Sequence, residues 1–254
     1  MNNLIDLSGK HILIIGASSG IGRQTAITLS ELGARLTLVA RREEMLKGAV
    51  ECLEGEGHDF YVADISNVES IEPLIKDVVE KDGSLDGLVY AAGIGMALPL
   101  IQSKPDKVQA AFSVNFFGFF EVVRQVSRKG RFNSGMRIVG VSSCASLRGD
   151  KSKAIYSSSK SAMDSAVRCM AKELAEKDIC INTVAPSMTA TELYERYLEK
   201  YGEGSESNRE LLSRQYLGIA QPQDIANAIA FLISPSARFI TGITMPVDGG
   251  LSTC

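Results

Sequence analysis

Three polar side chains in this sequence have the types and spacing needed to move a proton at a substrate oxygen. Tyr156 and Lys160 are four residues apart, which places both side chains on one face of a helix. Ser143 stands earlier, at the end of the apolar run RIVGVSS. A tyrosine phenol has a pKa of about 10, and a lysine ammonium nearby is expected to lower that pKa by about 1 to 3. We therefore predict that Tyr156 is a general acid and base.

A glycine-rich junction, ILIIGASSGIG, spans residues 12–22. A phosphate-binding P-loop is excluded, because its pattern requires a lysine after the second glycine and none follows here. The junction does match a hydrolase nucleophile elbow centred on Ser18, but that site needs a later histidine, and the last one is His58. A dinucleotide-binding turn remains. Its glycines let the backbone approach a pyrophosphate, and the following helix N-terminus offers free N–H groups.

The elements that must position these residues alternate along the chain. Nearly continuous apolar runs, typical of strands covered on both faces, are predicted at 11–16, 35–40, 59–64, 85–92, 136–143, 179–186 and 242–248. Amphipathic stretches predict helices at 20–32, 43–54, 67–82, 106–128, 154–177 and 222–233. Such alternation favours an α/β fold with a doubly wound, mostly parallel sheet of seven strands and helices on both faces.

Composition excludes several classes of function. The formal net charge of −3 lacks the excess of positive charge that is typical of nucleic-acid-binding proteins. No apolar run is long enough to span a membrane. Five cysteines without a C-x-x-C pair indicate reduced thiols in a cytoplasmic protein. The only histidines, His11 and His58, flank predicted strands, and we predict no metal site. No secretory signal is expected, because the N-terminal residues lack its pattern.

Together, these motifs resemble the short-chain dehydrogenase/reductase family over essentially the whole chain, and in particular its NADP-type 3-oxoacyl-carrier-protein reductases. The resemblance implies one Rossmann-like domain over 1–254. It implies a catalytic tetrad of Asn115, Ser143, Tyr156 and Lys160, in which Asn115 holds a water of a proton relay and Lys160 also binds the nicotinamide ribose. Besides Tyr156 and Lys160, the expected cofactor contacts are Gly16, Ser18, Ser19, Gly20, Ile21, Gly22, Asp64, Ile65, Ala92, Gly93, Pro186, Thr189 and Thr191.

The choice of cofactor is predicted from Arg41 and Arg42, which follow the second strand. Two guanidinium groups suit a 2′-phosphate, so NADP(H) is expected in preference to NAD(H); the alternative is a solvated pair. Three positions depart from the family pattern: Ile15 and Ala91 lack expected polar side chains, and Ser187 replaces a glycine. We expect Ser187 to shift the adjoining backbone, because glycine tolerates φ values that serine does not.

A small carbonyl or alcohol substrate is expected in an apolar pocket formed by Met96, Leu147, Met188, Leu193 and Tyr194, with no charged residue committed to it. The polar segment 189–218 predicts a mobile lid, or alternatively a pair of surface helices. A basic cluster could be a docking site for an acyl carrier protein. The favoured interpretation of the cluster is a solvated helix end. Its members are Arg124, Arg128, Lys129, Arg131 and Arg137.

Helical spacing of Phe112, Phe116, Phe119 and Phe120 predicts one buried face, against the core or a second subunit; the family resemblance implies a homotetramer or homodimer. The leading function is an NADP(H)-dependent oxidoreductase of the carbonyl reductase type, which moves a hydride between nicotinamide and a carbonyl or secondary alcohol. One alternative is a redox-sensing regulator that binds NADP(H) without turnover. Another is an isomerase or dehydratase that retains its nucleotide.

Overall fold

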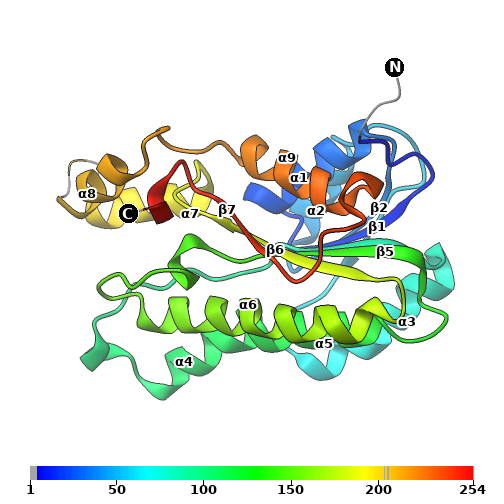
Figure 1. Ribbon diagram of the computed structural model, residues 1–254, viewed down its shortest axis with the longest axis horizontal. Helices are drawn as coiled ribbons and strands as arrows, with labels where there is room; N and C mark the ends of the chain where they lie inside the picture. Colours follow the sequence, from blue (N-terminus) through cyan, green and yellow to red (C-terminus); the bar gives the residue numbers. More distant parts are fainter. Residues whose placement is uncertain (1–4, 203, 205, 254) are drawn as a thin grey trace.

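The computed structural model describes residues 5–202, 204 and 206–253. At its centre lies a parallel sheet of seven strands in the order β3-β2-β1-β4-β5-β6-β7 (Figure 1). The strands are β1 (His11–Ile15), β2 (Arg35–Ala40), β3 (Asp59–Val62), β4 (Leu85–Tyr90), β5 (Phe132–Val141), β6 (Cys180–Pro186) and β7 (Thr244–Val247). All seven predicted runs are confirmed as strands, although β5 begins four residues before the predicted run.

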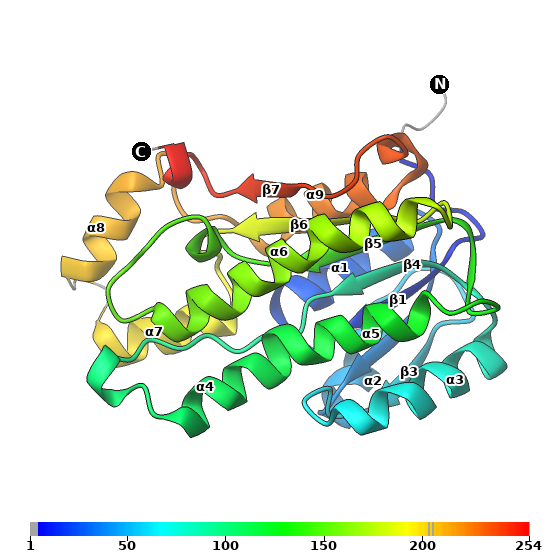
Figure 2. The ribbon, with the colours of Figure 1, turned by 60° about the horizontal axis from the view of Figure 1, so that its bottom comes forward.

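Helices cover both faces of the sheet, as Figures 1 and 2 show. One layer consists of α1 (Gly20–Glu31), α2 (Glu43–Val50) and α9 (Pro222–Ile233), and it encloses one apolar core. The opposite layer consists of α3 (Ile71–Asp82), α4 (Pro105–Phe112), α5 (Phe119–Val126) and α6 (Ala154–Ala175), and it encloses the other. Short 3₁₀ turns lie at Val68–Ser70, Leu100–Gln102, Cys144–Ser146, Pro235–Ala237 and Leu251–Thr253.

The sheet reverses its winding direction at β1. Ile15, the last residue of β1, pairs with Val39 of β2 on one side and with Tyr90 of β4 on the other. Ligands of such sheets bind outside the carboxyl ends of the strands at this switch point. The glycine turn begins at Gly16, directly after β1, and therefore lies where a nucleotide is expected.

A π turn, Ser113–Gly118, joins α4 to α5. The wider turn changes the helical phase, so the prediction of one buried phenylalanine face is wrong. Phe119 is fully buried beside Tyr90, whereas Phe120 is 43% exposed. Phe120 belongs instead to a contiguous surface group of rings in edge-on and tilted contact, which we call the aromatic cluster: Phe112, Phe116, Phe117 and Phe120.

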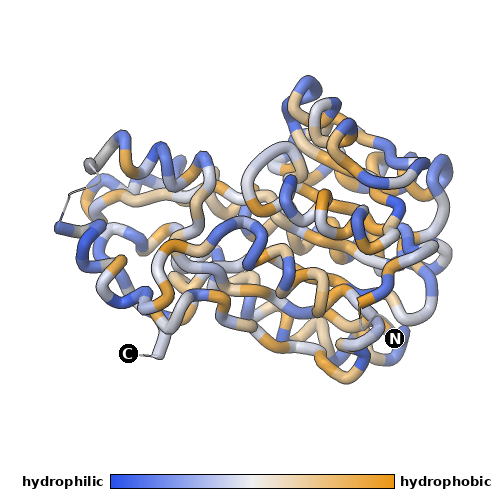
Figure 3. Tube along the Cα trace, turned by 90° about the horizontal axis from the view of Figure 1, so that it is seen from above, coloured by the Kyte–Doolittle hydropathy of each residue, from blue (hydrophilic) through white to orange (hydrophobic). Residues whose placement is uncertain are grey.

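Beyond the carboxyl ends of the strands lie α7 (Glu192–Tyr201) and α8 (Glu206–Arg214). Both project past the sheet at the same end of the molecule (Figure 2), and hydrophilic residues are frequent along them (Figure 3). They form most of the predicted lid segment, 189–218. No helix in the described part of the chain has the length and apolar composition to cross a membrane.

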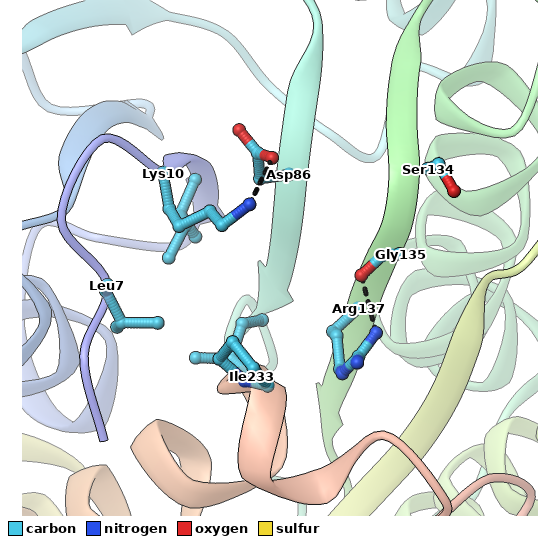
Figure 4. A pocket seen from close by; sticks show the side chains of 9 residues that line it. Leu7, Lys10, Asp86, Ser134, Gly135, Arg137 and Ile233 are labelled. Atoms are coloured by element: carbon cyan, nitrogen blue, oxygen red, sulfur yellow. Dashed lines mark hydrogen bonds and ion pairs between the residues drawn. The ribbon is translucent and has the colours of Figure 1, made fainter. Parts of the chain in front are cut away.

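A cavity of about 190 Å³ lies at the opposite end of the sheet, where the strands begin (Figure 4). We call this end the amino edge and the end where the strands finish the carboxyl edge. Here Lys10 Nζ lies 3.0 Å from Asp86 Oδ1, and Asp86 Oδ2 accepts a hydrogen bond from the backbone N–H of His11. The buried guanidinium of Arg137 donates to the carbonyl oxygens of Ser234 and Gly135. Each charged side chain of this cavity is therefore held by the protein's own groups.

The basic cluster does not form one surface. Arg124 pairs with Glu121, and Arg128 pairs with Glu72. Arg131 lies 3.8 Å from the same Glu72 carboxylate, whereas Arg137 is buried at the amino edge. These contacts favour a solvated, internally paired helix end over a docking site for an acidic carrier protein.

Candidate active site

The glycine turn is packed so closely that no side chain can be accommodated at Gly16 or Gly22. A Cβ built on Gly16, whose φ is +88°, would lie 2.5 Å from the backbone nitrogen of Ala92. A Cβ on Gly22 would lie 2.2 Å from the carbonyl oxygen of Gly16. The strand end, the turn and the start of α1 therefore form a cradle lined by backbone, which is what close approach of a pyrophosphate requires.

The N-terminus of α1 has the electrostatics of an anion site. Ser19 occupies the N-cap position but its side chain makes no capping bond, and the first turn contains no acidic residue. The guanidinium of Arg42 donates to Ser18 Oγ at 3.1 Å and to Ser19 Oγ at 2.9 Å. A cation therefore lies beside the free N–H groups at the positive end of the helix dipole, and the predicted cofactor residues fit a phosphate-bearing nucleotide.

Other predicted cofactor residues lie at the ends of β2 and β3. Arg41 and Asp64 are exposed. Hydrogen bonds from Ser66, with a smaller contribution from the Arg41 charge, hold the pKa of the Asp64 carboxyl below its usual value. Ile65 is buried, and its carbonyl oxygen lies 2.7 Å from where a Cβ on Gly118 would be. This close contact places the π turn directly beneath the strand end.

A cavity of about 430 Å³ brings together three of the four predicted catalytic residues. Ser143, Tyr156 and Lys160 all line it, as do Ile21, Gly93, Pro186, Thr189 and Thr191 from the predicted cofactor set. Ser143 follows β5, while Tyr156 and Lys160 lie on the first turns of α6. The carboxyl edge of the sheet and one helix thus position a hydroxyl, a phenol and an ammonium around one space.

The electrostatics of Tyr156 differ from the sequence prediction. Burial raises the pKa of its phenol, and a hydrogen bond with Ser143 lowers that pKa by less. The net shift of the Tyr156 pKa is upward, so the predicted lowering by the Lys160 ammonium is not found for the protein alone. The physical reason is desolvation, which disfavours the phenolate. A phenol that stays protonated suits reduction, because the carbonyl oxygen must then receive a proton.

Lys160 is buried, and its ammonium donates to the carbonyl oxygen of Val141 at 2.7 Å. Burial lowers the pKa of Lys160 to about 8, while the charge of Asp164, one turn further along α6, acts in the opposite direction. Asp164 is itself buried and accepts a hydrogen bond from Thr183 Oγ1 at 2.8 Å. This acid therefore stabilises the charged form of Lys160 from below the cavity.

Asn115 lies in the π turn and does not line the cavity. Its Oδ1 accepts the backbone N–H of Ile94 at 2.9 Å, and its Nδ2 donates to the Ile94 carbonyl and to Ser159 Oγ. A Cβ on Gly93 would lie 3.3 Å from Lys160 Nζ and 3.4 Å from Asn115 Oδ1. Asn115 therefore ties the loop after β4 to α6, beside Lys160, as a positioning residue.

The substrate wall is apolar in part, as predicted. Met96, Met188, Leu193 and Tyr194 line the cavity, whereas Leu147 is 47% exposed and does not, so that prediction is wrong. Besides Lys160, three further charged residues share the wall with the buried thiol of Cys144: Asp150, Lys153 and Arg196. Lining the cavity does not by itself commit any of them to the substrate. The position of Lys153, three residues before Tyr156, is the sequence signal that could have indicated a charged lining.

The three departures from the family pattern are accommodated locally. The backbone N–H of Ala91 donates to the Ile15 carbonyl at 2.8 Å, so the strand ends stay joined. Ser187 is not among the described non-glycine residues with positive φ, so its backbone does not adopt a conformation that favours glycine. Its Oγ is buried and has no hydrogen-bond partner among the described residues, although the residue lines the cavity.

Among described residues, no cluster of acids, histidines or cysteines could hold a metal.

Comparisons with known proteins agree with this geometry. A family model described as enoyl-(acyl carrier protein) reductase matches residues 16–252. A 3-oxoacyl-[acyl-carrier-protein] reductase of Thermotoga maritima is 34% identical over 248 residues, covering 96% of this chain and 98% of the relative. The corresponding reductase of Vibrio cholerae is 31% identical over 248 residues, covering 97% and 99%.

Solved structures show the same architecture. A dehydrogenase/reductase from Sinorhizobium meliloti is 30% identical, with a TM-score of 0.88, over 97% of this chain and 96% of the other. A short-chain type dehydrogenase/reductase from Mycobacterium ulcerans is 27% identical, with a TM-score of 0.90, over 98% and 91%. The likeness therefore extends over the sheet, the glycine turn and the catalytic cavity.

Proposed function

Because the chain belongs to the short-chain dehydrogenase/reductase family and is an oxidoreductase acting on carbonyl and alcohol groups, we propose that it works as a reductase with Tyr156 as the proton donor. The observation that carries this proposal is the meeting of Tyr156, Ser143 and Lys160 on one cavity wall beside the glycine turn. The relatives and the family model are described as reductases, which favours turnover over an NADP(H)-binding sensor.

The cofactor is NADP(H), and this chain's residues fit it. Gly16 and Gly22 supply the backbone cradle for the pyrophosphate, and Arg42 places a cation beside the turn. Arg41 adds a second, exposed cation at the end of β2. When bound, the nicotinamide supplies or accepts a hydride. We propose that the two arginines bind the 2′-phosphate, because a guanidinium donates to phosphate with charge-assisted, paired hydrogen bonds.

The chain's own residues handle the proton. In reduction, the Tyr156 phenol donates its proton to the substrate oxygen; in oxidation, the phenolate accepts it. The Ser143 hydroxyl donates a hydrogen bond to the same oxygen as negative charge develops there, while its Oγ accepts the N–H of Ala145 at 3.2 Å. Lys160 holds a positive charge beside this site. Asn115 anchors the loop that packs against Lys160, and its role in a water relay remains a proposal.

The direct test is Tyr156→Phe. This substitution removes only the phenol oxygen, so turnover should fall by about a hundredfold or more, while binding of NADPH stays nearly unchanged. Cofactor binding is followed by fluorescence titration and turnover by NADPH absorbance with a panel of ketones. Activity of the variant within tenfold of the wild type would refute the assignment of Tyr156.

We also propose that residues 189–218 close over the substrate. Thr191, Leu193 and Tyr194, at the start of this segment, line the cavity, which favours a lid over an unrelated pair of surface helices. Hydrogen exchange with and without NADPH tests this: α7 should become more protected when the cofactor binds. Equal protection in both states would rule out the lid.

The substrate we propose is a small carbonyl compound in the cytoplasm. The relatives are named for acyl-carrier-protein substrates, but Arg124, Arg128 and Arg131 of the basic cluster lie beside acids of this chain, which disfavours docking of an acidic carrier there. The four cysteines within the described residues are all free thiols, consistent with a reducing compartment.

For assembly, we propose that the aromatic cluster packs against a second copy of the chain, because Phe117 and Phe120 are 39% and 43% exposed. A charged residue at Phe120 should then produce monomers by light scattering. An unchanged molar mass would refute this interface.

A further inference from the structure

Two cations on the wall of the catalytic cavity lack an acidic partner. Lys153 and Arg196 both line this cavity. Within the described part of the chain, neither side chain forms an ion pair. Arg196 Nε donates to the backbone carbonyl oxygen of Glu192 at 3.0 Å, so this bond fixes the guanidinium without neutralising it. Its remaining N–H groups can still donate to a ligand.

The one acid that lines the cavity has its own partner. Asp150 Oδ1 lies 3.0 Å from Arg148 Nη2, and both side chains are largely buried. Arg148 also donates to the carbonyl oxygen of Leu251 at 3.2 Å, which fixes the pair in place. The negative charge of Asp150 is therefore offset by Arg148, and the charges of Lys153 and Arg196 leave the substrate wall net positive.

Lys153 also lies close to the reacting groups. It precedes α6 directly, three residues before Tyr156, and its side chain cannot cap the helix. The positive end of the α6 dipole therefore adds to the Lys153 charge. Lys153 lines the same cavity as Cys144, the residue after Ser143. Burial raises the pKa of the Cys144 thiol, and the Lys153 charge acts in the opposite direction with a smaller effect.

Building on the proposed reductase function, we propose that Lys153 and Arg196 bind an anionic group of the substrate, so that the preferred substrates are ketones that carry a carboxylate or a phosphate. The Lys153 side chain is half-buried, and a partly desolvated cation is unfavourable without a counter-charge. Arg196 is exposed on the same cavity wall, and a bound anion would supply a counter-charge to both residues. A guanidinium and an ammonium each make charge-assisted hydrogen bonds to carboxylate and phosphate oxygens. Met96 and Leu193 would contact the carbon chain between the anion and the ketone.

The test compares substrates that differ only in charge. Short-chain oxo carboxylates are each paired with their methyl ester, and phosphate-bearing ketones of similar length form a third arm. The wild type should prefer the anionic member of each pair by about ten- to hundredfold in kcat/KM. Preference between carboxylate and phosphate identifies which anion the site takes.

The variants locate the preference. Lys153→Met and Arg196→Gln should each reduce kcat/KM for the anionic ketone by about tenfold or more and leave the ester nearly unchanged. Lys153→Arg should retain most of the preference. Lys151→Met is the matched control, because Lys151 is exposed, lies outside the cavity lining and carries the same charge.

The possible failures are distinguishable. If the wild type reduces neither charged nor neutral ketones, the proposed reductase function fails. If it reduces both members of each pair equally, or if Lys153→Met and Arg196→Gln keep the preference, the anion site is overturned while the reductase function stands. NADPH titration of each variant verifies that the fold and the cofactor cradle are intact.

Discussion

At the amino edge of the sheet, Lys10 is paired with Asp86 and Arg137 donates to two backbone carbonyls, whereas at the carboxyl edge Lys153 and Arg196 face a larger cavity and have no acidic partner among the described residues. Both edges hold a hollow lined by cations. At the first, the protein satisfies its own charges, which indicates a structural role. At the second, Lys153 and Arg196 have no counter-ion among the described residues, which indicates a site that binds an anion. The state of pairing, more than the presence of a cavity, separates the functional edge from the structural one.

The largest effect is expected from Gly16→Ala, which places a side chain in the backbone cradle at the carboxyl edge. The new Cβ would lie 2.5 Å from a backbone nitrogen, at a φ of +88°. Strain and overpacking together should lower the free energy of unfolding by about 2–4 kcal/mol and abolish NADPH binding. Gly48→Ala is the control: nothing lies within 4 Å of that site in α2, so a gain of about 1 kcal/mol is expected. Urea denaturation of both variants decides the outcome.

The next effect concerns cofactor choice. The wild type should use NADPH better than NADH by about ten- to hundredfold in kcat/KM. Arg41→Asp and Arg42→Asp should each reduce or reverse this ratio, because a carboxylate repels the 2′-phosphate. Lys47→Glu, a charge reversal on α2, is the control. An NADH preference in the wild type, or ratios unchanged in both aspartate variants, would show that the phosphate binds elsewhere.

A smaller effect is expected at the amino edge. Asp86→Ala leaves the buried N–H of His11 without its acceptor and Lys10 without its partner, so the free energy of unfolding should fall by about 1–3 kcal/mol. Because this edge is structural, kcat with NADPH should stay within about twofold of the wild type. A large loss of turnover in a folded Asp86→Ala protein would contradict the comparison of the two edges.

The smallest effect is a pH dependence of stability caused by Lys160. Its pKa in the folded protein is about 8, against an ordinary value of 10.5. Between these values the unfolded chain binds more protons at this site, so stability should rise with pH across the window. Above about pH 10 the raised pKa of Tyr156 acts in the opposite direction. Lys160→Met should flatten the rise between pH 8 and 10 in urea titrations; an identical slope in both proteins would exclude this origin.

The fold was predictable because its signals are local. The apolar run at His11–Ile15 and the glycines after it are dictated by burial and by backbone sterics, and both are visible in the sequence. The π turn was not, because nothing in SVNFFG distinguishes it from an ordinary helix. Its wider spacing arises where Gly118 packs against Tyr90 and Ile65, contacts that are distant in sequence. The burial of the phenylalanines was therefore only partly predicted.

In the candidate site, too, the features that depend on local spacing were predictable and those that depend on tertiary packing were not. Motif spacing was sufficient to predict that Tyr156, Lys160 and Ser143 meet. The positions of Lys153 and Arg196 depend on how α6 and α7 approach each other across the cavity, which no local pattern encodes. The pKa of Tyr156 also depends on burial, and the sequence prediction took account of a neighbouring charge but not of desolvation. Whether a cation has a partner and how exposed it is to solvent depend on the tertiary structure. These two properties decide whether the cation pairs within the protein or can bind a ligand.

The strand order has a consequence for how the protein is made. β1 pairs with β4, so one neighbour of β1 is synthesised only after β2 and β3. Such non-local pairing makes folding slow and leaves strand edges open meanwhile. The cofactor cradle needs residues up to Ala92, whereas the substrate cavity also needs Leu251, close to the end of the chain. All residues of the pyrophosphate cradle are therefore synthesised well before the last residue of the substrate wall.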